Sequence, residues 1–203
     1  MIMEAEKKHT RIDSLLASLQ PLVLDVGGSA GTLHEELRKR FTPEQLISLD
    51  IEILNVRTNQ VLGDGQKMPF RNEAFKSILA GETIEHIADY RAFLRECWRV
   101  LRPNGVLALS TPNKKSWFNR ITHSYEHPLH VSLFTPAQLR KVLEEEGFSI
   151  QKMELFPYTM ESSDGAKHKW VFPVRDFVHA LMPDSLREDM VFVCRKKTQR
   201  TSS

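Results

Sequence analysis

The chain has 203 residues, of which 41% are hydrophobic and 27% are charged, and its formal net charge is +2. These values are ordinary for a folded protein, and they exclude wholesale disorder, a collagen-like repeat and a disulfide-dense scaffold. The near balance of charges gives no electrostatic argument for binding to nucleic acid. The length predicts a single domain over residues 1–203.

Along the chain, short apolar runs alternate with helical stripes, which is typical of an α/β protein with a buried parallel sheet. The predicted strands are Leu22–Val26, Leu46–Leu49, Gln60–Leu62, Phe75–Ala80, Val106–Leu109, Phe148–Phe156 and Met190–Cys194. Because helices separate most of them, we expect a doubly wound, mostly parallel sheet.

Three helices between these strands are marked by apolar stripes and end signals. The first carries a stripe at Leu33, Leu37 and Phe41 and ends at 42–43. The second is capped by Asp89 and stops at 102–105, where Pro and Gly occur. The third begins with a capping box at Thr135 and ends at Gly147.

Two insertions, at about 113–134 and 157–188, do not fit the alternation. Loops of this length usually form lids or binding segments, and both lie near strand ends, where α/β sheets bind ligands. The second contains an apolar piece, Trp170–Met182, whose spacing favours packing on the domain.

The two cysteines, Cys97 and Cys194, lie in separate apolar segments and form no C-x-x-C pair. They are therefore expected to be buried free thiols in a reducing compartment. The first nine residues lack the apolar core of a secretory signal, and no apolar run approaches the ~20 residues that span a bilayer. We therefore expect a cytoplasmic protein without a transmembrane segment; the sequence does not indicate an oligomeric state.

Acidic residues stand at the ends of three consecutive predicted strands: Asp25, Asp50 and Asp64. A glycine-rich turn follows Asp25, but it matches neither the G-x-G-x-x-G fingerprint nor a Walker A loop. Carboxylates at these positions can accept hydrogen bonds from ribose hydroxyls or an adenine amine, and they would repel a pyrophosphate. The pattern therefore favours a nucleoside ligand without phosphates.

With these features the sequence resembles the class I S-adenosylmethionine-dependent methyltransferases. Residues 23–31 are similar to the first motif of that family, D-x-G-x-G-x-G, with Ser29 in place of the middle glycine. Residues 47–50 and 63–70 are similar to its ribose-binding and adenine-binding motifs. Residues 82–86 match an E-x-x-E-H that follows the fourth strand in many members, and 93–113 match the helix, turn and strand beyond it.

The resemblance implies a Rossmann-like seven-stranded sheet of order 3-2-1-4-5-7-6, with strand 7 antiparallel, and S-adenosyl-L-methionine as cofactor. It also implies the residues of a cofactor site: Asp25, Gly27, Gly28, Ser29, Gly31, Asp50, Ile51, Asp64, Gly65, Gln66 and Gly81.

Glu82, Glu85 and His86 have spacing i, i+3 and i+4, so on a helical turn they would share one face. Two carboxylates with an imidazole suit magnesium, manganese or iron. In two groups of the resembled family this motif binds a divalent metal: the ubiquinone-biosynthesis O-methyltransferases and the small-RNA 3′-terminal 2′-O-methyltransferases, which add a later histidine. His130 matches that later position.

The resemblance thus implies four catalytic residues facing the acceptor, which are also candidate ligands for Mg²⁺ or Mn²⁺: Glu82, Glu85, His86 and His130. The plainer interpretation is that Glu85 and His86 make structural hydrogen bonds, while His130 packs the loop or acts as a general base.

From these features we predict a methyltransferase that acts on a hydroxyl or carboxyl group of a small molecule. The chain has Ala-Gly-Glu-Thr at 80–83, where methyltransferases of bases and of glutamine have an Asn/Asp-Pro-Pro-Tyr/Phe motif. Two alternatives remain open. One is 2′-O-methylation of an RNA 3′ terminus, which the basic segment 114–130 favours and the net charge opposes. The other is a non-catalytic, cofactor-binding partner subunit.

Overall fold

The computed structural model describes residues 10–28, 32–52, 59–117, 120, 129–157, 183 and 186–198. A seven-stranded sheet of order β3-β2-β1-β4-β5-β7-β6 runs through the described part. β7 pairs antiparallel with both neighbours, and the other pairings are parallel. The predicted order and direction are therefore confirmed. The strands are β1 Val23–Val26, β2 Leu46–Asp50, β3 Gln60–Leu62, β4 Phe75–Gly81, β5 Leu101–Pro112, β6 Phe148–Phe156 and β7 Asp189–Lys196.

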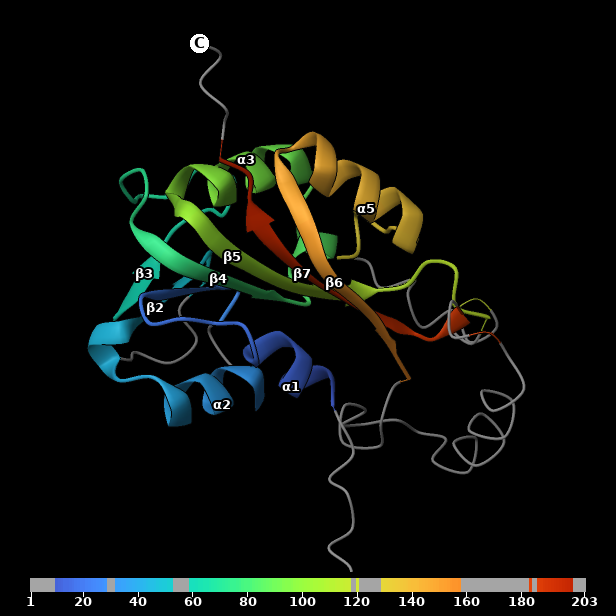
Figure 1. Ribbon diagram of the computed structural model, residues 1–203, viewed down its shortest axis with the longest axis horizontal. Helices are drawn as coiled ribbons and strands as arrows, with labels where there is room; N and C mark the ends of the chain where they lie inside the picture. Colours follow the sequence, from blue (N-terminus) through green and yellow to red (C-terminus); the bar gives the residue numbers. More distant parts are fainter. Residues whose placement is uncertain are drawn as a thin grey trace, which may run out of the picture.

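Helices cover both faces of the sheet, as Figure 1 shows, with α3 and α5 on one face and α1 and α2 on the other. The described helices are α1 Arg11–Leu16, α2 Thr32–Arg40, α3 Tyr90–Val100 and α5 Pro136–Glu145, with 3-10 turns η1 Pro43–Gln45 and η2 Ile84–His86. The predicted caps hold, because Asp89 accepts from the amide of Ala92 and Thr135 forms its capping box with Gln138. No helix in the described ranges is long and apolar enough to cross a membrane.

The sheet separates two apolar cores, because neighbouring residues of a strand point to opposite faces. Leu24 and Val26 face the first core, under α3 and α5, whereas Val23 faces the second core, under α1 and α2. Both cysteines are free and buried, as predicted, and burial raises the pKa of the Cys97 thiol well above its usual range.

Two features differ from the sequence-based expectation. Helix α1 was not predicted, because its six residues are too short to show a stripe. Strand β5 begins at Leu101 rather than Val106, since the pairing with β4 jumps from Phe75–Leu101 to Ser77–Val106 and residues 102–105 bulge. Most of the insertion at 157–188, including Trp170–Met182, lies outside the described residues.

Candidate functional site

The carboxyl ends of the parallel strands bring the predicted cofactor residues to one edge of the sheet. The amide of Gly27, after β1, donates to the carbonyl of Leu49 at 2.8 Å. The amide of Gly63, after β3, donates to the carbonyl of Asp50 at 2.8 Å. The turns after β1 and β3 therefore both adjoin the end of β2, as the ligand-binding edge of an open α/β sheet requires.

The turn after β1 depends on the absence of side chains at two glycines. Gly27 has φ +79°, and a Cβ there would lie 2.7 Å from the hydroxyl of Thr83, which itself donates to the carbonyl of Val26. A Cβ on Gly28 would lie 1.9 Å from Oδ2 of Asp25. Ser29 and Gly31, predicted members of this turn, lie outside the described residues.

Asp25 lies beneath this turn and is 3% exposed. Its Oδ2 is 2.8 Å from Nδ1 of His34 in α2, whose side chain is 5% exposed. Burial raises the pKa of Asp25, the hydrogen bond and charge of His34 oppose that rise, and the nearby Asp50 adds to it.

The other predicted cofactor residues lie on the strand ends beside the turn. Asp50 is half-buried, and the next side chain, Ile51, is 69% exposed. The carboxylate of Asp64 accepts from the backbone amide and the side-chain amide of Gln66, at 2.8 and 3.1 Å. Gly65 is buried, and Gly81 is the half-buried last residue of β4.

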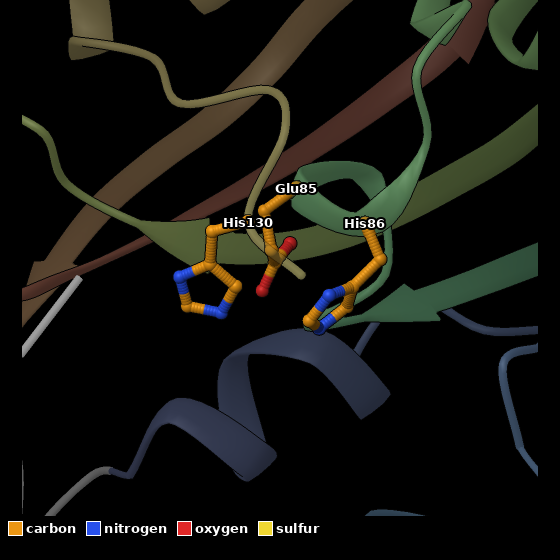
Figure 2. A group of neighbouring side chains, drawn as sticks. All are labelled: Glu85, His86 and His130. Carbon is orange, nitrogen blue, oxygen red and sulfur yellow. The ribbon is translucent and has the colours of Figure 1, made fainter. Parts of the chain in front are cut away.

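The structure brings Glu85, His86 and His130 together, with one possible ligand atom from each lying within 4.8 Å of the others (Figure 2). The two imidazole ring centroids are 4.9 Å apart. Segment 129–132 is held against η2 because the amides of Val131 and Ser132 donate to the carbonyl of Glu85 at 2.8 and 3.0 Å. The group therefore joins two adjacent residues of η2 with His130, which lies 44 positions beyond His86 in the sequence.

A hydrogen bond indicates the tautomer of His86, and burial favours the protonated form of Glu85. Nδ1 of His86 lies 3.1 Å from the carbonyl oxygen of Leu129, which can only accept, so Nδ1 carries a proton. The hydroxyl of Thr111 donates to Oε2 of Glu85 at 2.9 Å. Burial, followed by the charge of Glu82, raises the pKa of Glu85 to about 8, so its carboxyl holds a proton at neutral pH.

Glu82, predicted to belong to this group, faces different partners. It has φ +51° and precedes η2, so it does not share a helical turn with Glu85 and His86. Its Oε1 accepts from Arg11 of α1 at 2.5 Å and from the hydroxyl of Ser110 at 2.6 Å. The group brought together thus has one carboxylate and two imidazoles, where the spacing predicted a second carboxylate.

Arg11 and His34 are the residues of this region that sequence reasoning missed. Arg11 also lies 3.4 Å from the carboxylate of Asp189, whose pKa burial raises well above its usual range. Thr10 and Asp13 form a capping box around Arg11, which is a signal for the helix but not for its distant partners. His34 belongs to none of the motifs described above, so no sequence pattern indicated its contact with Asp25.

Comparisons with known proteins identify the proteins that this chain resembles. Residues 24–109 match the family model described as a methyltransferase domain. The chain is 27% identical over 171 residues to a ubiquinone biosynthesis O-methyltransferase of Rhodopseudomonas palustris, covering 71% of this chain and 65% of that protein. It is 26% identical over 183 residues to a demethylmenaquinone methyltransferase of Thermotoga maritima, covering 74% and 80%.

The fold has close counterparts among solved structures. A methyltransferase structure from Bacillus halodurans, 19% identical, superposes with a TM-score of 0.66 over 93% of this chain and 99% of that one. At this identity the likeness concerns the fold alone. The family model and the sheet order point to the same class of protein.

Proposed function

Because the chain belongs to the class I S-adenosylmethionine-dependent methyltransferases, we propose that it methylates a hydroxyl group of a small molecule. The observation that carries the choice of a hydroxyl is the group of Glu85, His86 and His130 at the end of β4. A hydroxyl must lose a proton as it accepts a methyl group, and a group that can take it is needed nearby. A carboxylate acceptor has no such need.

For the cofactor, we propose that Asp50 accepts from the ribose hydroxyls, Asp64 from the adenine amine, and Ile51 packs on the adenine. In support, the two carboxylates lie on neighbouring turns, and Ile51 exposes an apolar side chain beside them. The Gly27–Gly28 turn, with Ser29 and Gly31 following it in the sequence, would admit the cofactor close to the backbone beside Gly65, Gln66 and Gly81. The bound cofactor supplies a methyl group on a positively charged sulfur.

At the acceptor, we propose that His86 receives the hydroxyl proton. Its Nδ1 donates a hydrogen bond to the Leu129 carbonyl, so the lone pair of the neutral ring lies on Nε2. Leu129 and Val131, which are 62% and 59% exposed, flank His130 and would contact an apolar part of the acceptor. Glu82 would act indirectly, by holding Arg11 and Ser110 beside this region.

A divalent cation is the second candidate for the same group. Glu85 would release its proton on binding a cation. One carboxylate and two imidazoles are a known donor set for non-haem iron, whereas Mg²⁺ prefers oxygen ligands. With Glu82 bound to Arg11, the group favours a transition metal over Mg²⁺. The chain spans 65% of the length of the relative named as a ubiquinone biosynthesis O-methyltransferase. The name of that relative supports an oxygen atom as the methyl acceptor.

Calorimetric titration with S-adenosylhomocysteine in EDTA tests the cofactor site. We expect micromolar binding that Asp50→Ala weakens and the surface variant Lys141→Ala leaves unchanged. Absence of binding would refute the assignment. Adding Fe²⁺ or Mn²⁺ under anaerobic conditions then separates the two candidates, since a cation site predicts a heat that His130→Ala abolishes.

Methyl transfer to phenols, aryl carboxylates and an RNA 3′ end would separate the predicted acceptors. We expect transfer to phenols, with a loss of about 100-fold or more in kcat for His86→Ala. Transfer to the RNA but not to its 2′-deoxy form would favour the RNA alternative. Cofactor binding without turnover on any acceptor would favour the partner-subunit alternative.

A further inference from the structure

A hydrogen-bonded pair of ionisable side chains, Asp25 and His34, is buried under the cofactor turn, on the face of the sheet that carries the second core. Asp25 and Ser48 are neighbours in the register of β1 and β2, and both side chains lie on the face that α2 covers. His34, in α2, lies against Asp25 and Ser48. Its Nδ1 is 2.8 Å from Oδ2 of Asp25 and 3.5 Å from the hydroxyl oxygen of Ser48.

Packing alone gives no reason for these residue types. Val23, Leu37 and Leu46 surround the same region of the second core, and an apolar side chain at position 34 would extend the sheet-facing side of α2. Burying a carboxylate and an imidazole costs free energy that the hydrogen bond between them only partly returns. Buried ionisable pairs that carry such a cost are typical of functional sites, where the position of the side chains matters for binding.

The position of the carboxylate links His34 to the cofactor turn. The oxygen bound to His34, Oδ2 of Asp25, is also the atom that a Cβ on Gly28 would meet at 1.9 Å. The carboxylate is thus packed directly against the backbone of Gly28. On the other side, the amide of Gly27 is fixed to the carbonyl of Leu49.

We infer that His34 is a positioning residue for the cofactor: by fixing the carboxylate of Asp25 against Gly28, it holds the Gly27–Gly28 turn in its binding shape. This inference rests on the proposed cofactor site. The electrostatics agree with it, because His34 is the partner that opposes the rise in the pKa of Asp25 caused by burial. Without that partner, Asp25 would tend toward its neutral form and lose its fixed orientation.

The test uses two amides that differ in where they place a donor. His34→Asn puts an N–H group near the position of Nδ1, whereas His34→Gln puts it near Nε2 and leaves the Asp25 contact unfilled. S-adenosylhomocysteine affinity is measured by calorimetry, and stability is measured by urea unfolding. We expect His34→Gln to weaken binding about tenfold or more, and His34→Asn to stay within about threefold of the wild type.

Ser77→Ala is the matched control. Its hydroxyl accepts from the amide of Gln20 at 2.8 Å and is buried near the opposite end of β4, so its loss removes a buried hydrogen bond far from the turn. We expect Ser77→Ala to lower stability and leave the affinity unchanged. Equal affinities in His34→Asn and His34→Gln, or equal weakening in Ser77→Ala, would overturn the inference.

Failure of the wild type to bind S-adenosylhomocysteine would instead refute the cofactor site itself, and this inference with it. Should His34→Gln not fold, His34→Leu replaces it, since it fills the buried position and removes the hydrogen bond to Asp25. We then expect binding about tenfold weaker than wild type; unchanged binding would again overturn the inference.

Discussion

The guanidinium group of Arg11 lies 2.5 Å from the carboxylate of Glu82, 71 positions further along the chain. This contact joins helix α1 to the end of β4, and the hydroxyl of Ser110 in β5 binds the same carboxylate oxygen. Oδ2 of Asp189, at the start of β7, lies 3.4 Å from the same guanidinium nitrogen, Nη1 of Arg11. One cation thus connects the N-terminal helix with three strands at the ligand-binding edge.

Replacing Arg11 by methionine should leave the two acids without this cation. The pair with Glu82 is partly exposed, so we expect a loss of about 1–2 kcal/mol in the free energy of unfolding, measured in urea at pH 7. Lys39→Met is the control, since its bond to Glu36 joins side chains that are 69% and 36% exposed and should contribute less. An equal loss in the two variants would contradict this role for Arg11.

The alternation of strands and helices was sufficient to predict the sheet. Gln60–Leu62 and Phe148–Phe156 have their predicted bounds, because residues typical of turns flank both segments: Asn59 and Gly63 for the first, Gly147 and Pro157 for the second. The sheet order required the family resemblance, since periodicity does not specify which strands are neighbours. The start of β5 was misplaced because Pro and Gly at 102–105 signal a helix stop and a turn, whereas the structure accommodates them as a bulge.

The site was predictable where the spacing was local or where the family resemblance supplied a position. The pairing of Glu85 with His86 is local, and His130 was placed beside them by resemblance; the three do converge. Glu82 does not, because its positive φ turns it away from η2 and toward Arg11. A positive φ at a glutamate leaves no sign in the sequence, and neither do contacts such as Arg11–Glu82 that only the folded sheet creates.

The raised pKa of Glu85 should make stability depend on pH. Between its ordinary value of 4.5 and about 8, the native carboxyl retains a proton that the unfolded chain has released. The free energy of unfolding should therefore fall as the pH rises through this range. Urea unfolding in EDTA from pH 5 to 8 measures the slope.

Glu85→Gln should reduce that slope without abolishing it, because the pKa values of Asp25 and Asp189 are raised in the same direction. Glu144→Gln, a substitution on the exposed side of α5, should keep the wild-type slope. Equal pH slopes for Glu85→Gln and the wild type would contradict the prediction that Glu85 is protonated in the native state.

Gly28→Ala should disturb the cofactor turn more than an alanine elsewhere. The added Cβ would lie 1.9 Å from Asp25, so either the carboxylate or the backbone must move. We expect S-adenosylhomocysteine affinity to fall about tenfold or more, measured by calorimetry. Gly63→Ala is the comparison, because its nearest obstacle is the flexible end of Leu49 at 2.9 Å. A smaller effect for Gly28→Ala than for Gly63→Ala would contradict the packing described above.

Lys196 should stabilise the opposite end of the sheet, away from the proposed site. Its buried Nζ donates to the carbonyl of Leu101 at 2.7 Å and lies 3.9 Å from the centroid of the Trp98 ring. Lys196→Met would remove the donor and leave the carbonyl of fully buried Leu101 without it, which should cost about 1–3 kcal/mol in urea unfolding. Lys197→Met is the control: its exposed Nζ lies 3.5 Å from a carbonyl, so we expect little change. If Lys196→Met were as stable as the control, hydrophobic contact with Trp98 would compensate for the lost hydrogen bond, and the cation would not be what stabilises this end of β7.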